Sequence, residues 1–131
     1  MLRLIRSLSS GTVTPLLWTL ITIILLCLPG SDLPGKGIFG AIENFDKFVH
    51  VVLFGGVVLF WGCWSHLRQP DDREWFRSLV SITLAGIVMG IALEYVQLYL
   101  IPNRGFDKAD ISADIAGCLA AFGYLIMVRK Q

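Results

Sequence analysis

The sequence predicts an all-α integral membrane protein, built as a bundle of four transmembrane helices with both termini in the cytoplasm. Of its 131 residues, 55% are hydrophobic and 16% are charged, and the mean hydropathy is +0.69. Soluble domains have about 45–50% apolar and about 25% charged residues, so this chain lacks the polar residues that a water-exposed surface requires. The apolar residues also gather in four stretches close to the length of about 20 residues that crosses a hydrocarbon core as a helix.

The same composition excludes three other classes of protein. The high hydrophobicity excludes a disordered chain, and the formal net charge of +1 gives no basic surface for nucleic acid. The 3 cysteines argue against a secreted disulfide scaffold. Cys27, Cys63 and Cys118 lie in separate apolar stretches, and we interpret them as inert buried thiols.

The first apolar stretch covers residues 12–29, and we expect it to be retained as a transmembrane helix. Arg3 and Arg6 precede it, as basic residues precede the apolar core of a cleaved secretion signal. However, its end at Pro29 leads straight into polar residues without a small-x-small cleavage site. We therefore favour a membrane anchor over a signal peptide.

Three further stretches complete the bundle, at residues 48–66, 78–101 and 111–128. A polar loop over residues 67–77 joins the second to the third. A tight loop over residues 102–110 makes the last two an antiparallel pair. Neither these loops nor residues 30–45 are long enough for a folded soluble domain, so we expect one membrane domain over residues 1–131.

Lysine and arginine are distributed unevenly between the two sides of this bundle. With the N-terminus inside, seven of these residues lie on the cytoplasmic side and four on the outer side. The positive-inside rule then places both termini in the cytoplasm and the first and third loops outside. The inner set is Arg3, Arg6, Arg68, Arg73, Arg77, Arg129 and Lys130, and the outer set is Lys36, Lys47, Arg104 and Lys108.

The third stretch contains polar residues, which are costly inside a membrane. Glu94 lies about seven residues before the outer end, which is roughly 10 Å deep at the helical rise of about 1.5 Å per residue. Gln97 shares its face, and Gly90 and Gly86 continue the same stripe towards the other end. Because such glycines let another helix approach closely, the stripe is expected to face the bundle. Glu94 and Gln97 are either a structural link between helices or part of a functional polar site.

One face of the fourth stretch carries carboxylates at the outer end and small residues further in. Arg104, in the preceding loop, is expected within reach of Asp107, Asp110 and Glu94. A guanidinium at that place is either an ordinary surface residue or a binder of phosphate or carboxylate. The face consists of Asp107, Asp110, Asp114, Gly117 and Ala121, at intervals of three or four residues.

The second stretch begins with Asp46, Lys47 and His50, also at the outer boundary. The spacing lets His50 share a face with either neighbour, as a capping or hydrogen-bonding residue or as a catalytic one. Asp46 either stabilises the helix N-terminus or belongs to a site. The polar residues expected to converge in the outer third of the membrane are Asp46, Lys47, His50, Glu94, Gln97, Arg104, Asp107, Asp110 and Asp114.

The chain contains no established cofactor motif. One histidine with several carboxylates could form an oxygen-rich magnesium or calcium site, but the cysteines and histidines lack the spacing of transition-metal ligands. Nucleophilic triads, phosphate-binding glycine loops and nucleotide fingerprints are also missing. We therefore assign no metal and no cofactor.

The ordered set of these residues carries a resemblance to a known family. Its parts are Asp46-Lys47 with His50, Glu94-x-x-Gln97, Pro102-x-Arg104, Asp110 and Gly117. Over about residues 45–123, the chain resembles the VanZ-like family of small bacterial membrane proteins. Where that family commonly has asparagine, this chain has Asp114, which adds a negative charge when ionised. The resemblance implies a multi-helix protein of the bacterial cytoplasmic membrane, linked in some members to low-level teicoplanin resistance and to no settled reaction.

Three classes of function remain, and we favour the first. It is a non-enzymatic envelope protein whose outer-facing polar pocket binds a lipid-linked or peptide-like ligand, such as a membrane lipid or a cell-wall precursor. Arg104 and Lys47 would hold its anionic groups, while the carboxylates and Gln97 would accept its donors. The second is an intramembrane enzyme acting on a lipid head group, with Glu94 or His50 as general base and Arg104 stabilising negative charge. The third, a proton-coupled carrier, is the weakest because the inner helix halves are almost wholly apolar. The oligomeric state stays open.

Overall fold

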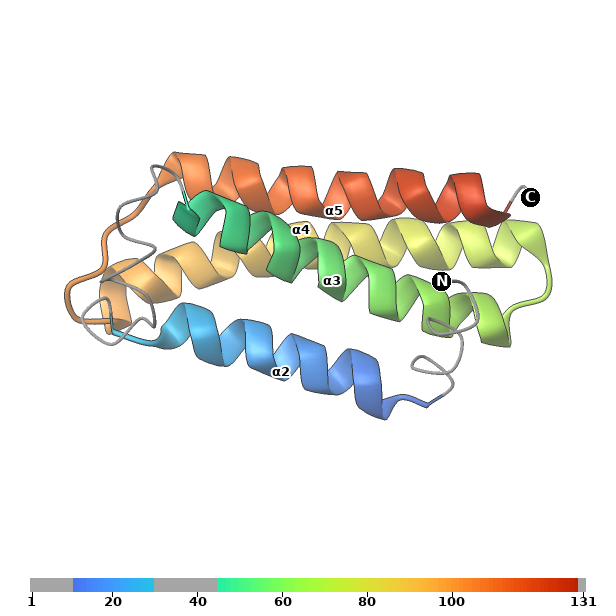
Figure 1. Ribbon diagram of the computed structural model, residues 1–131, viewed down its shortest axis with the longest axis horizontal. Coiled ribbons are helices and arrows are strands. Elements are labelled where there is room, and N and C mark those ends of the chain that lie inside the picture. Colours follow the sequence, from blue (N-terminus) through green and yellow to red (C-terminus); the bar gives the residue numbers. More distant parts are fainter. Residues whose placement is uncertain (1–10, 30–44, 130–131) are drawn as a thin grey trace.

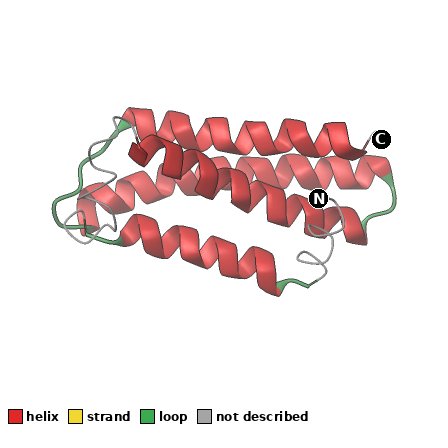
Figure 2. Cartoon of the chain, viewed as in Figure 1, coloured by secondary structure: helices red, strands yellow, loops and turns green. Residues whose placement is uncertain are grey.

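The computed structural model describes residues 11–29 and 45–129, and every regular element in these two ranges is a helix (Figures 1 and 2). The helices are α2 (Val13–Cys27), α3 (Phe45–Arg68), α4 (Asp72–Leu100) and α5 (Lys108–Arg129). They run alternately in opposite directions, so that α2 begins at the end of the bundle where α5 ends (Figure 1). The predicted all-helical class is confirmed. Of the charges used for orientation, Arg3, Arg6, Lys36 and Lys130 lie outside the described residues.

Three of the four helices are long and apolar enough to cross a membrane. By length and composition α3, with 24 residues, α4, with 29, and α5, with 22, qualify, which makes the chain a multi-pass membrane protein. The 15 residues of α2 extend only about 22 Å at the usual helical rise, less than the hydrocarbon thickness of about 30 Å. Its outward side nevertheless exposes large apolar side chains, as a lipid-facing helix does: Val13, Leu16, Leu17, Leu20 and Ile24.

Helices α3, α4 and α5 begin earlier than their apolar residues suggest. The predicted polar loop over residues 67–77 is wrong, because α4 already begins at Asp72. The carboxylate of Asp71 accepts the backbone N–H groups of Arg73 at 2.9 Å and Glu74 at 3.0 Å, which caps the helix at its first turn. Helices α3 and α5 likewise each begin three residues earlier than predicted. Their first turns are polar, and hydropathy alone does not detect them.

Asp71→Ala should lower the free energy of unfolding by about 1 kcal/mol, the usual loss when an N-cap side chain is removed. Titration with a denaturing detergent in mixed micelles measures this change. Asp71→Ser is the matched control, because its hydroxyl can accept the same N–H groups and should retain most of the stability. Equal stability of the alanine and serine variants would contradict the capping role of Asp71.

Small residues allow close contact between the helices, above all between α3 and α5, which share the most extensive contact. A Cβ atom added at Gly117 would meet the backbone of α3, at the carbonyl oxygen of Val51 and at 3.0 Å from the amide nitrogen of Gly55. At Gly86 it would lie 3.1 Å from the sulfur of Cys118. Close helix contact of this kind replaces hydrophobic burial as the main source of packing energy in a membrane. All four residues expected to pack, Gly86, Gly90, Gly117 and Ala121, are buried.

Arg129 holds together the end of the bundle where α3 joins α4. Its guanidinium lies 2.6 Å from the carboxylate of Asp72 and 2.9 Å from Nδ1 of His66, and it donates to the carbonyl oxygens of Gln69 and Pro70. It also lies over the ring of Trp75, 4.6 Å from the centroid. The last turn of α5 is thereby fixed to the α3–α4 loop. The charge of Arg129, used above only for orientation, therefore has a structural role.

Candidate functional site

The polar residues expected to form a site all lie at one end of the bundle, which we call the polar end. Here α2 ends, α3 begins, and the loop over residues 101–107 joins α4 to α5 (Figure 1). Helix α3 contributes Asp46, Lys47 and His50, α4 contributes Glu94 and Gln97, the loop contributes Arg104 and Asp107, and α5 contributes Asp110 and Asp114.

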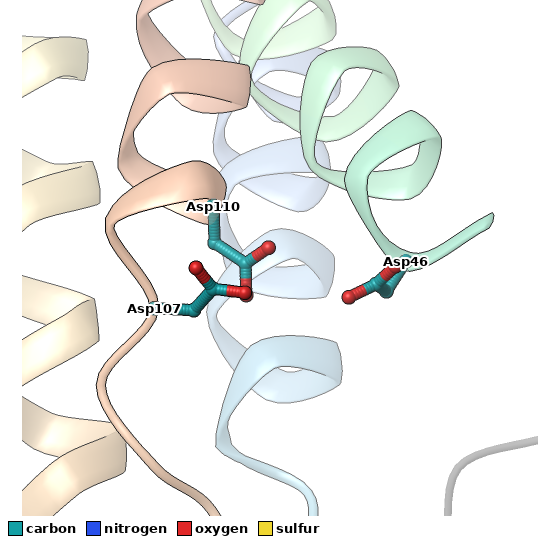
Figure 3. Close-up of side chains that lie close together, drawn as sticks. All are labelled: Asp46, Asp107 and Asp110. Atoms are coloured by element: carbon teal, nitrogen blue, oxygen red, sulfur yellow. The ribbon is translucent and has the colours of Figure 1, made fainter. Parts of the chain in front are cut away.

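Lys47 is the centre of the exposed part of the polar end. Its ammonium nitrogen lies 3.1 Å from a carboxylate oxygen of Asp46, 3.1 Å from one of Asp107 and 3.3 Å from one of Asp110. These three carboxylates come from the first turn of α3, the loop and the first turn of α5 (Figure 3). Their oxygens lie within 4.8 Å of one another, close enough to hold a cation, and the ammonium of Lys47 lies among them. Lys47 therefore joins α3 to α5 through carboxylates and is not free for an anionic ligand.

A buried histidine–carboxylate pair lies about one turn deeper. Nδ1 of His50 is 2.8 Å from the carboxylate of Asp114, and Nε2 is 3.8 Å from that of Asp110. The side chains of His50 and Asp114 are 4% and 2% exposed. A general base needs a nitrogen directed at its substrate, but both ring nitrogens of His50 face carboxylates. This arrangement suits a residue that connects helices better than a catalytic base.

Glu94 faces the same carboxylates from α4. One of its oxygens, Oε2, accepts the backbone N–H of Asp107 at 2.9 Å, and the residue is 1% exposed. One turn earlier, a Cβ atom at Gly90 would lie 2.8 Å from the carboxylate of Asp114, so this face of α4 points at α5. The other oxygen, Oε1, is buried without a hydrogen-bond partner within the described ranges. A buried acceptor without a donor is costly, so this oxygen is suited to accept a further donor.

Gln97 and Arg104 have different partners from those expected. The amide of Gln97 donates to the carbonyl oxygen of Leu26 at 2.8 Å, so it fixes α4 to the end of α2. Arg104 forms no ion pair among residues 11–29 and 45–129, and its Nε is buried without a partner. Arg104 was expected within reach of Asp107, Asp110 and Glu94, and an ion pair with any of them is not among the contacts of the described residues. Lys47, on the first turn of α3, pairs with the carboxylates of Asp46, Asp107 and Asp110 instead.

The polar end carries more negative than positive groups. Its five carboxylates accompany one lysine, one arginine and one histidine. At Asp107, which lies outside the helices, the backbone N–H of Ala109 and the ammonium of Lys47 hold the pKa below its ordinary value. Unbalanced charge of this kind is costly close to hydrocarbon. The carboxylates are those of Asp46, Glu94, Asp107, Asp110 and Asp114.

Fold and site together define a small multi-pass helical membrane protein with an acidic polar end. Comparison with known proteins adds no relative: no family model, curated protein or solved structure matches the chain. The resemblance to the VanZ-like family therefore rests on the ordered residues from Asp46 to Gly117 and stays a hypothesis.

Proposed function

We propose that this chain is a VanZ-like protein of the bacterial cytoplasmic membrane whose polar end binds an envelope lipid or a cell-wall-related ligand. In this proposal α2 is the fourth membrane helix and both termini are cytoplasmic, which puts the polar end in the outer leaflet. The basic residues Arg68, Arg73 and Arg77 support this orientation, because they gather at the opposite end. An effect on teicoplanin susceptibility belongs to the same proposal.

The observation that carries the proposal is Glu94 Oε1, a buried acceptor to which no described residue donates, beside an excess of carboxylates. Ionisable residues within membrane segments are rare and usually functional. The lysine that we expected to hold anionic ligand groups, Lys47, is instead held by three carboxylates. The sequence suggested Lys47 and Arg104 as the residues that hold anionic groups of a ligand, and in this proposal only Arg104 keeps that role. The carboxylates are left to accept the donors of the ligand.

An intramembrane enzyme is the second candidate. One observation favours it. Oε1 of Glu94, to which no described residue donates, could act as a general base that takes a proton from a lipid head group. His50 is a poorer candidate because carboxylates face both its ring nitrogens. A proton-coupled carrier stays weakest. In the part of the chain that is described, the buried polar residues nearer the other end, Thr83 and Ser65, are not ionisable.

Glu94→Ala and Arg104→Ala should each abolish the phenotype that the protein confers, tested as a change in teicoplanin susceptibility between deletion and complemented strains. Membrane abundance, measured on immunoblots, should stay unchanged. Lys108→Ala is the matched control, because it removes an exposed charge next to the loop and should keep the phenotype. Loss of the protein itself in the first two variants would show that these residues are structural and would contradict the proposal.

Mass spectrometry separates the binder from the enzyme. Purified protein is incubated with native envelope lipids and cell-wall precursors, and both the bound and the free molecules are identified. Recovery of an unchanged ligand that is lost with Glu94→Gln supports binding. A new product that disappears with the same variant would overturn the binding proposal in favour of the enzyme.

A further inference from the structure

An open apolar groove of about 460 Å³ lies between α3 and α5. Gly55, Gly117 and Ala120 are among its lining residues, and Val51 and Leu59 mark its extent along α3. These two residues are about 12 Å apart at the usual helical rise, which fits within half of a hydrocarbon core of about 30 Å. The groove therefore lies along the membrane-spanning part of α3 and α5, and its apolar lining suits the acyl chain of a lipid.

The groove leads to the polar end along the same helix faces. Val51 follows Lys47 by four residues on α3, and Gly117 follows Asp110 by seven on α5. Residues at these spacings lie above one another on a helix. A single amphiphilic molecule can therefore place its chain in the groove and its head group among the carboxylates.

The carboxylates are suited to a primary ammonium. Lys47 shows this directly, because its own ammonium lies 3.1–3.3 Å from three of them and offers three N–H donors. Within residues 11–29 and 45–129 no group donates to Glu94 Oε1, and the five carboxylates outnumber Lys47, His50 and Arg104. The polar end is therefore complementary to a second ammonium, supplied by a ligand.

Arg104 is suited to the anionic part of the same head group. It lies three residues before Asp107 in the loop, and it forms no ion pair within the described portion of the chain. Its guanidinium has five donors in a planar fork that matches a phosphate. From these contacts and the groove we infer that the polar end binds a phospholipid with a primary ammonium head group. The inference rests on the proposed function and names the ligand class of that site.

Lipid titrations of the purified full chain, followed by native mass spectrometry, test the head group. Phosphatidylethanolamine should bind at least tenfold more tightly than phosphatidylcholine, which has the same phosphate and chains but no N–H donors. Glu94→Gln should reduce this ratio. Equal binding of the two lipids overturns the inference. If phosphatidylglycerol or a cell-wall precursor binds instead, and Glu94→Gln abolishes this binding, the inferred ammonium head group is wrong but the proposed function stands. Absence of any ligand that depends on Glu94 overturns both.

Lys47→Ala tests whether the ligand supplies the same chemistry as the lysine. The variant should be less thermally stable than the wild type in phosphatidylcholine, because three carboxylates lose their shared cation. Phosphatidylethanolamine should raise its melting temperature more than that of the wild type, since a ligand ammonium can take the vacated place. An equal rise in both proteins, or a larger rise with a divalent cation alone, contradicts the inference.

Ala120→Phe tests whether the groove holds the acyl chain. It changes no charged residue, so the test does not depend on whether Lys47→Ala folds. It should weaken the binding of long-chain phosphatidylethanolamine at least tenfold. The binding of glycerophosphoethanolamine, which is the head group without acyl chains, should not change. Leu119→Phe is the matched control, because Leu119 is 52% exposed and does not line the groove. Equal effects of the two phenylalanine variants would rule out the groove as the place of the acyl chain.

Discussion

Gly117→Leu should lower the free energy of unfolding by about 3 kcal/mol or more, at or beyond the upper end of the usual cost of overpacking a close contact. Any side chain at Gly117 would meet the backbone of α3 at Val51 and Gly55. The backbone of a helix cannot adopt another rotamer as a side chain can, so α3 and α5 would have to move apart. Because these two helices share the most extensive contact in the bundle, unfolding with denaturing detergent should show a large loss.

Gly123→Leu is the matched control on the same helix. A Cβ atom at Gly123 has no heavy atom within 4 Å, and replacing a helical glycine favours the helix by up to about 1 kcal/mol. This variant should therefore be as stable as the wild type or more stable. Similar losses at the two positions would show that general helix properties, and not the contact at Gly117, determine stability.

The helices were predictable from the sequence because hydropathy and length depend only on local composition. Three long apolar helices are confirmed, but their polar first turns were missed. At α4 the missing information was in the sequence, since Asp71 follows Pro70 and precedes Glu74 by three residues, an arrangement typical of a helix start. The short length of α2, 15 residues where 18 were expected, has no such signal.

The gathering of the polar residues could also be predicted, because spacing determines which face of a helix a residue occupies. Their partners could not. Spacing does not say which neighbouring helix a long side chain reaches, so the contacts of Lys47 with three carboxylates were not predicted. Gln97 was expected among the same groups, whereas it donates to the backbone of Leu26, 71 residues away in the sequence. Such long-range contacts depend on how α2 packs on α4, which no local pattern specifies.

Asp114→Ala should lower the free energy of unfolding by about 3 kcal/mol, the lower end of the range for breaking a buried charged pair. The carboxylate lies 2.8 Å from Nδ1 of His50, and both side chains are nearly inaccessible. Without it, His50 loses its close hydrogen-bond partner, and space opens beside Gly90, which faces Asp114 from α4. Denaturation in mixed micelles measures the loss, and unchanged stability would contradict a structural role of the pair.

Asp114→Asn separates the hydrogen bond from the charge, and it introduces the residue that is common in the VanZ-like family. The amide oxygen can still accept an N–H from His50. The free energy of unfolding should therefore fall by at most about 1 kcal/mol, the contribution of an ordinary hydrogen bond. The substitution also removes one negative charge from a site with an excess of carboxylates, and this gain in stability offsets part of the loss. If Asp114→Asn is more stable than the wild type but binds phosphatidylethanolamine less tightly, the carboxylate serves the ligand. If it loses as much stability as Asp114→Ala, the charge itself holds His50 in place.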